Sequence, residues 1–232
     1  MKPGLFLLLL ACSSPFAWAQ SKGANTICKN DAMLMHPATL KKLNIQLPVS
    51  QHYCYSDQTG NYVLYLAEEQ DVEYQSENLS NNIAAYQFRI EDDQSLTNPI
   101  IIRDKAARND TGVAFRQKLI EFADIDGDGR IEPILVYRFY LDDDAKINYD
   151  PYFGHLKIIM LYKGEKVVIR ASTGPYHGDA FTTASENFFS LPKSVQEYLA
   201  RKMKKMSEDK LFAFEHKHNY MPLKKREPYK EF

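Results

Sequence analysis

A short acidic segment, residues 124–132, constrains the fold more than any other part of this 232-residue chain. It reads D-I-D-G-D-G-R-I-E, with aspartates at positions 1, 3 and 5 and a glycine at position 6. A helical EF-hand loop would carry a bidentate glutamate at position 12, where this chain has Leu135. Both flanks are apolar and β-favouring, so the segment predicts a metal loop between two β-strands.

The chemistry of this loop is that of a calcium site. Ca²⁺ takes six to eight oxygen ligands at about 2.3–2.6 Å, many of them from carboxylates. We expect three aspartate side chains, one backbone carbonyl and one glutamate, acting directly or through water, to supply them. In chain order these are Asp124, Asp126, Asp128, the carbonyl of Arg130, and Glu132. The alternative is an Asp- and Gly-rich turn that holds no ion.

The remaining pattern predicts a mainly β (α+β) fold, with an antiparallel sheet or sandwich and a C-terminal amphipathic helix. Fifteen tyrosines and thirteen phenylalanines suit such a fold. Pro99 marks a strand start, and Lys163, Gly164 and Glu165 look like a tight hairpin turn. Apolar or alternating runs predict strands at residues 62–66, 84–90, 100–102, 115–123, 131–140, 155–162 and 166–171.

Apolar residues at helical spacing predict a helix over about residues 192–206, with Ser190 as its cap. Basic residues gather in its last turns, where cations suit the helix dipole. They are Arg201, Lys202, Lys204 and Lys205. We interpret this run as a solvated helix face, and a membrane-surface patch is the alternative.

The N-terminus carries the three parts of a secretory signal peptide. Lys2 is basic, residues 5–11 are apolar, and A-W-A at 17–19 is a cleavage site. We therefore expect residues 1–19 to be removed, leaving a single β-rich domain over 20–232 that is periplasmic or secreted. The apolar run is far shorter than the about 20 residues of a membrane span, and no second long run follows. The alternatives are a lipoprotein acylated at Cys12 and a buried N-terminal strand.

After cleavage the chain would keep two cysteines, Cys28 and Cys54. An even pair in an oxidising compartment predicts one disulfide, which stabilises by about 3.5 kcal/mol in the chain-entropy model. Two separate buried thiols are the alternative. A metal pair is less favoured, because no histidine has the usual ligand spacing from either cysteine.

The pattern D-x-D-G-D-G-x-x-E resembles the loop of FG-GAP and VCBS-type repeats, although one copy does not imply a propeller. More broadly, residues 115–189 resemble a family of small exported bacterial proteins labelled as involved in surface polysaccharide biosynthesis. The residues that carry this resemblance are F-A-D-I-D-G-D-G at 122–129, Glu132, V-Y-R at 136–138, L-K-I-I-M at 156–160 and V-I-R at 168–170. The resemblance implies export and fold. The chain departs from the family near residues 140–150, where Asp142, Asp143 and Asp144 replace a Cys-containing stretch.

The net charge and the absence of several motifs narrow the classes of function that the sequence supports. A formal net charge of −1 gives no electrostatic support for nucleic-acid binding. The chain has no G-x-S-x-G elbow, phosphate loop or zincin motif. Polar segments at 142–144, 177–179, 216–218 and 224–226 read as solvated loops or tail. The sharper alternatives are added calcium ligands, an acid–base pair at His177 and Asp179, a transition-metal site at His216 and His218, and contact with anionic lipid or glycan.

We therefore expect an exported, non-enzymatic calcium-binding protein of the bacterial envelope that binds a glycan or a protein. The first alternative is a periplasmic immunity protein that blocks a toxic effector. The second is a calcium-dependent hydrolase of envelope polymers. A hydrolase would need a cleft beside the loop with paired carboxylates of shifted pKa.

Overall fold

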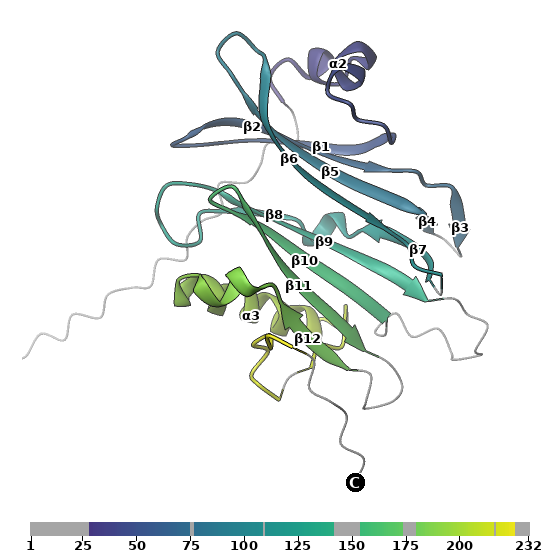
Figure 1. The fold of residues 1–232 in the computed structure, drawn as a ribbon, viewed down its shortest axis with the longest axis vertical. Coiled ribbons are helices and arrows are strands. Elements are labelled where there is room, and N and C mark those ends of the chain that lie inside the picture. The colour runs from purple at the N-terminus through teal and green to yellow at the C-terminus, as the bar shows by residue number, and fades with distance from the viewer. Residues whose placement is uncertain are drawn as a thin grey trace, which may run out of the picture.

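The chain forms four layers, in which two antiparallel sheets pack face to face and helices cover both outer sides (Figure 1). The computed structural model describes residues 28–74, 77–108, 110–141, 154–173, 180–215 and 217–225. The predicted mainly β fold with a C-terminal helix is confirmed. The expected signal peptide at 1–19 and the alternative lipid site at Cys12 lie outside the described residues.

The first sheet has the strand order β1-β2-β5-β6. Its central strands are buried on both faces, since Leu64 and Leu66 face the second sheet while Val63 and Tyr65 face the helical layer. This alternation follows from the period of two in an extended chain. The strands are β1 (Val49–Asp57), β2 (Gly60–Glu68), β5 (Asn82–Ile90) and β6 (Leu96–Lys105), and a separate ribbon is formed by β3 (Val72–Tyr74) and β4 (Glu77–Leu79).

The second sheet has the order β12-β11-β10-β9-β7, with β8 also paired to β9. Leu135 and Tyr137 of β9 point to the first sheet, whereas Ile134 and Val136 point to the C-terminal helix. The strands are β7 (Asp110–Phe115), β8 (Glu121–Ala123), β9 (Glu132–Leu141), β10 (Gly154–Tyr162), β11 (Glu165–Thr173) and β12 (Phe181–Ala184).

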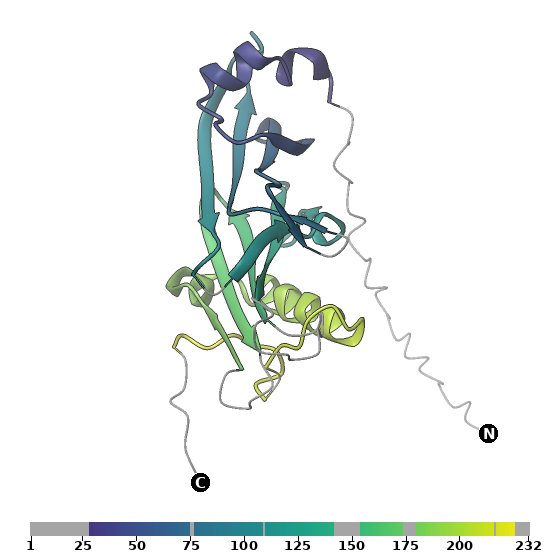
Figure 2. The same cartoon turned by 90° about the vertical axis from the view of Figure 1, so that its right-hand side faces the viewer.

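Short helices cover the first sheet and a long helix covers the second (Figure 2). The short ones are α1 (Asp31–Leu34) and α2 (Pro37–Lys42), and the long one is α3 (Lys193–Glu208). The predicted disulfide between Cys28 and Cys54 is confirmed and ties the start of the helical layer to β1. No helix within the described ranges is long and apolar enough to cross a membrane.

The predicted hairpin between β10 and β11 is present, but Glu165, expected in the turn, is the first residue of β11. Tyr162 pairs with Glu165, and Lys163 and Gly164 between them have φ of 50° and 85°. Two consecutive left-handed residues are what a two-residue type I′ turn requires.

Four local predictions were wrong. The strand expected at 115–123 is split by the 3₁₀ turn η1 (Gln117–Leu119). Pro99 lies inside β6, at a bulge where two residues of β6 face one residue of β5. Ser190 ends the 3₁₀ turn η3 (Glu186–Ser190), and Pro192 stands at the N-cap of α3. Lys202 is buried, so the basic run on α3 is not wholly a solvated face.

Candidate metal centre

The acidic loop is the connection of a β-hairpin. Ala123, the last residue of β8, pairs with Glu132, the first residue of β9, so the antiparallel ladder closes the loop at its base. Gly127 and Gly129 have φ of 76° and 83°, in the left-handed region that glycine adopts without steric cost. These two residues let the chain turn back tightly enough to bring the aspartates together.

Three of the predicted ligands converge. The side chains of Asp124, Asp126 and Asp128 each offer a carboxylate oxygen, and these atoms lie within 4.8 Å of one another. Each aspartate also accepts a backbone N–H from within the loop: from Gly129 at 3.0 Å, from Asp128 at 3.3 Å and from Arg130 at 3.0 Å, respectively. The loop backbone therefore holds the three carboxylates in one place.

Two buried oxygens at this site lack a hydrogen-bond partner. They are Oδ1 of Asp124 and Oε1 of Glu132. Glu132 is 1% exposed, and its other carboxylate oxygen accepts the N–H of Ile125 at 2.8 Å. A buried carboxylate oxygen without a partner costs free energy, which a bound cation would remove. The donor set therefore fits a hard cation such as Ca²⁺.

The electrostatics of Glu132 are consistent with such an ion. Burial raises the pKa of Glu132 to about 7, and the charges of the three aspartates add to that rise. Glu132 is not in the 4.8 Å set that the aspartates form. Glu132 would therefore either anchor the loop or bind the ion through a water molecule.

A cationic side chain that sequence reasoning missed already faces the loop. Nζ of Lys163 lies 2.8 Å from Oδ2 of Asp128 and 3.4 Å from Oδ2 of Asp126. Its hydrogen bond to Asp128 holds the pKa of that carboxyl below its ordinary value. The hydroxyl of Tyr162 donates to Oδ2 of Asp126 at 2.7 Å. Only the pairing of the strands places this hairpin turn beside the loop.

The β1–β2 hairpin of the first sheet holds the acidic loop through hydrogen bonds. The N–H of Ile131 donates to Oδ2 of Asp57 at 3.1 Å, and the N–H of Gln58 donates to the carbonyl of Gly129 at 3.0 Å. The side-chain amide of Gln58 also bonds the carbonyl of Asp128. The loop is therefore held by residues of both sheets.

A small pocket opens beside the loop, with an empty volume of about 390 Å³ that includes the part open to solvent. Within it the rings of Tyr55 and Tyr62 stack with centroids 5.0 Å apart, and the Tyr55 hydroxyl donates to Gln87 at 2.7 Å. The lining residues are Tyr55, Asp57, Thr59, Tyr62, Gln87, Arg130, Ile131, Pro133, Leu161, Lys163 and Gly164. The metal loop and the pocket thus share a wall.

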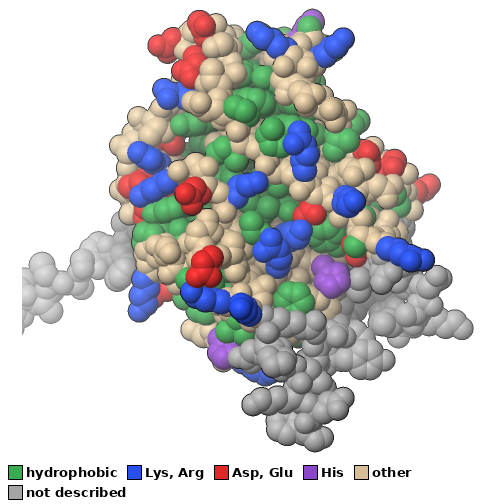
Figure 3. All heavy atoms as spheres, in the orientation of Figure 1, with side chains coloured by type: hydrophobic (Ala, Val, Ile, Leu, Met, Phe, Trp, Pro, Cys, Tyr) green, Lys and Arg blue, Asp and Glu red, His purple; other side chains and the backbone are tan. Residues whose placement is uncertain are grey.

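Other segments singled out from the sequence contribute less. Asp142 to Asp144, His177 to Asp179, His216 and Arg226 lie outside the described residues. His218 and Lys225 are exposed, and Nζ of Lys224 pairs with Glu186 at 2.6 Å. On the face shown in Figure 3, Lys and Arg side chains are spread among hydrophobic and acidic ones.

Comparison of the chain with protein-family models, with curated proteins and with solved structures gave no match.

Proposed function

We propose that this chain is a non-enzymatic calcium-binding protein of the bacterial envelope, in which one Ca²⁺ in the loop at 124–132 stabilises a glycan-binding pocket. The observation that carries the proposal is the convergence of the Asp124, Asp126 and Asp128 carboxylates, together with the buried, unpartnered oxygens of Asp124 and Glu132. The loop that bears them also supplies Arg130 and Ile131 to the pocket wall.

The role of calcium in this proposal is structural. An extracellular-type site binds Ca²⁺ with a dissociation constant of about 10⁻⁴ to 10⁻³ M. At about 1 mM calcium the folded state then gains about 0.4–1.4 kcal/mol. A gain of this size suits a permanent structural role of the ion in the loop better than a signalling switch. The signal-peptide pattern and the Cys28–Cys54 disulfide both support an exported protein.

The composition of the pocket supports a hydroxyl-rich ligand. Stacked aromatic rings offer an apolar face, and hydroxyl, amide and guanidinium groups offer hydrogen bonds, which is the mixture typical of small-ligand sites. Asp57 is the one carboxylate among its described lining residues, and it accepts hydrogen bonds from Thr59 and Ile131. This favours binding over hydrolysis by paired carboxylates. The resemblance to proteins labelled for surface polysaccharide biosynthesis points to glycans as well.

Calcium binding is tested by comparing the melting temperatures of the wild type and Asp126→Ala, with 1 mM Ca²⁺ and with a chelator. Calcium is expected to raise the melting temperature of the wild type by a few degrees. The variant is expected to gain almost nothing, because it lacks one ligand. An equal response of both proteins would show that the loop is an empty turn.

Glycan binding is tested by titrating the protein with soluble peptidoglycan fragments and with lipopolysaccharide oligosaccharides. Arg130→Ala is the matched variant: it trims the pocket, while only the Arg130 carbonyl belongs to the expected calcium shell. We expect this variant to lose glycan affinity and keep its calcium response, whereas Asp126→Ala loses the calcium response. Absence of glycan binding by the calcium-loaded wild type would leave the metal site standing and refute the pocket's function.

A further inference from the structure

A second group of metal-ligating side chains lies on the outer, helix-covered face of the first sheet, between α1 and β1. Ligand atoms of Cys28, Asp31 and His52 lie within 4.8 Å of one another. Cys54 is not in that set, but it is bonded to Cys28, so its sulfur lies next to the group and becomes a fourth donor when the disulfide is reduced. This group contains none of the residues of the acidic loop.

Local geometry explains why these four side chains meet. Asp31 begins α1 three residues after Cys28, which places both at the start of the helical layer. His52 and Cys54 are two residues apart on β1, and alternate residues of a strand share a face. The His52 ring stacks on Tyr65, whose side chain packs under the helices together with Cys54. The segment that leads into α1 therefore supplies Cys28 and Asp31, and β1 supplies His52 and Cys54.

His52 and Asp31 are already in contact with each other. Nε2 of His52 lies 2.5 Å from Oδ1 of Asp31. The His52 side chain is 16% exposed and that of Asp31 is 51% exposed, so an ion has access from the Asp31 side. Cys28 is 4% exposed and lies on the inner side of the group.

We propose that the chain binds one Zn²⁺ at this point once the disulfide is reduced, so that the same side chains serve either as a cross-link or as a metal site. The four ligands are Cys28, Asp31, His52 and Cys54. Two sulfurs, one imidazole nitrogen and one carboxylate oxygen form a four-coordinate set that suits tetrahedral zinc. The proposal is independent of the calcium loop and of the glycan pocket.

The chemistry balances with a dithiol as reductant. The dithiol gives two electrons and two protons to the Cys28–Cys54 bond and becomes a cyclic disulfide, while the chain gains two thiols. Zinc then binds both sulfurs as thiolates, and two protons leave to solvent. The hydrogen bond between His52 and Asp31 breaks, and each of the two side chains binds the ion instead.

The test uses the full mature protein, oxidised or reduced with excess dithiol and freed of it under nitrogen, in 1 mM Ca²⁺ so that the acidic loop holds calcium. One equivalent of Zn²⁺ is added, and retained zinc and melting temperature are measured. We expect one zinc per reduced chain, none per oxidised chain, and a higher melting temperature of the reduced protein with zinc. With Co²⁺ in place of zinc, the reduced protein should show a thiolate-to-cobalt charge-transfer band.

Two variants distinguish a four-ligand zinc site from zinc binding by the two thiols alone. His52→Ala and Asp31→Asn are expected to weaken zinc binding by the reduced chain at least about tenfold. The matched control is His36→Asn, which removes an exposed imidazole but keeps a side chain able to cap α2; it should bind zinc as the wild type does. The proposal is overturned if the reduced wild type retains no zinc, or if His52→Ala binds and is stabilised by zinc as strongly as the wild type.

Discussion

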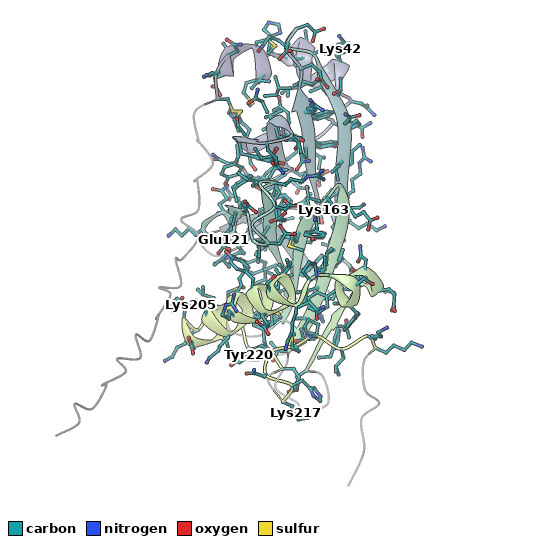
Figure 4. All side chains as sticks on the ribbon, turned by 90° about the vertical axis from the view of Figure 1, so that its left-hand side faces the viewer. Lys42, Glu121, Lys163, Lys205, Lys217 and Tyr220 are labelled. Carbon is teal, nitrogen blue, oxygen red and sulfur yellow. A yellow bond between two sulfur atoms is a disulfide. The ribbon has the colours of Figure 1, made fainter. Side chains whose placement is uncertain are left out.

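At the scale of single residues, Lys163 places a positive charge directly against the acidic loop. Its ammonium lies against Asp128 and Asp126, where a bound ion would compete for the same oxygens. In Figure 4, Lys163 lies well above α3 and projects from the hairpin turn between β10 and β11. If the loop binds calcium as proposed, the ion would have to displace this ammonium from the two carboxylates, which would lower the affinity of the loop for calcium.

We predict that Lys163→Met raises the calcium affinity of the loop by about two- to fivefold, because a competing cation is removed. The measurement is a calcium titration of both proteins by calorimetry at low ionic strength. Lys166→Met is the control, since Lys166 is on the same hairpin but bonds the Ile101 carbonyl instead. Equal or weaker calcium binding by Lys163→Met would contradict competition at this site.

At the scale of secondary-structure elements, a buried charge fastens α3 to the strand that leads into the metal loop. Nζ of Lys202 donates to Oε1 of Glu121 at 2.6 Å and to the Leu119 carbonyl at 2.8 Å. The Tyr198 hydroxyl donates to the other oxygen of Glu121 at 3.0 Å. Burial lowers the pKa of Lys202, and the charge of Glu121 opposes that shift. The two partners differ in exposure: the side chain of Lys202 is 5% exposed and that of Glu121 is 40% exposed.

This difference predicts unequal costs of removing either partner. Glu121→Ala leaves a buried ammonium without its counter-charge and is expected to destabilise the protein by about 3 kcal/mol. Lys202→Met leaves a carboxylate that water reaches and is expected to cost about 1 kcal/mol or less. Urea unfolding of the two variants and the wild type measures both. A larger loss in Lys202→Met would contradict the assignment of Lys202 as the desolvated partner.

At the scale of the whole molecule, the sequence predicted best the strands that are buried on both faces. The run at 62–66 was recognised because this part of β2 lies between two layers and has no charged or amide side chain. By contrast β1, an edge strand that alternates with polar residues, carries no such run and was missed. The short helices α1 and α2 were missed for a related reason, because they are too brief to show a helical period.

The candidate sites divide in the same way. The convergence of Asp124, Asp126 and Asp128 follows from local spacing, so it was predictable. The contact with Lys163 and the group around His52 depend on strand pairing and on the docking of α1, which no local pattern contains. A metal at the cysteines was disfavoured because no histidine has the usual motif spacing from either of them. His52 nevertheless reaches the site, because it lies on the same face of β1 as Cys54.

The many buried tyrosines predict how the whole fold responds to alkaline pH. Burial is the main cause that raises the pKa of Tyr53, Tyr55, Tyr65, Tyr137 and Tyr198 above 10. Because the folded state then holds these protons more tightly than the unfolded state, their stabilisation is complete below pH 10 and is lost as pH rises further. The lowered pKa of Lys202 acts in the opposite direction, but it is a single group.

We therefore expect the free energy of unfolding to fall above pH 10, by up to about 1.4 kcal/mol per pH unit for each buried tyrosine. Denaturant unfolding at pH 8, 9.5 and 11 measures this, and ultraviolet absorbance of tyrosinate reports the delayed titration. Stability that is unchanged between pH 8 and 11, with all tyrosines titrating near pH 10, would show that these rings are not desolvated as the structure indicates.

The bulge in β6 has a consequence for association between copies of this chain. β6 is an edge of the first sheet, and an open edge is a template on which a strand of another chain can pair. Asn98, with φ of 50°, and Pro99, which has no N–H, interrupt that edge in its first half. A foreign strand meets a kinked backbone and a missing donor there. The proline that looked like a strand boundary in the sequence thus protects a β-rich protein against edge-to-edge aggregation.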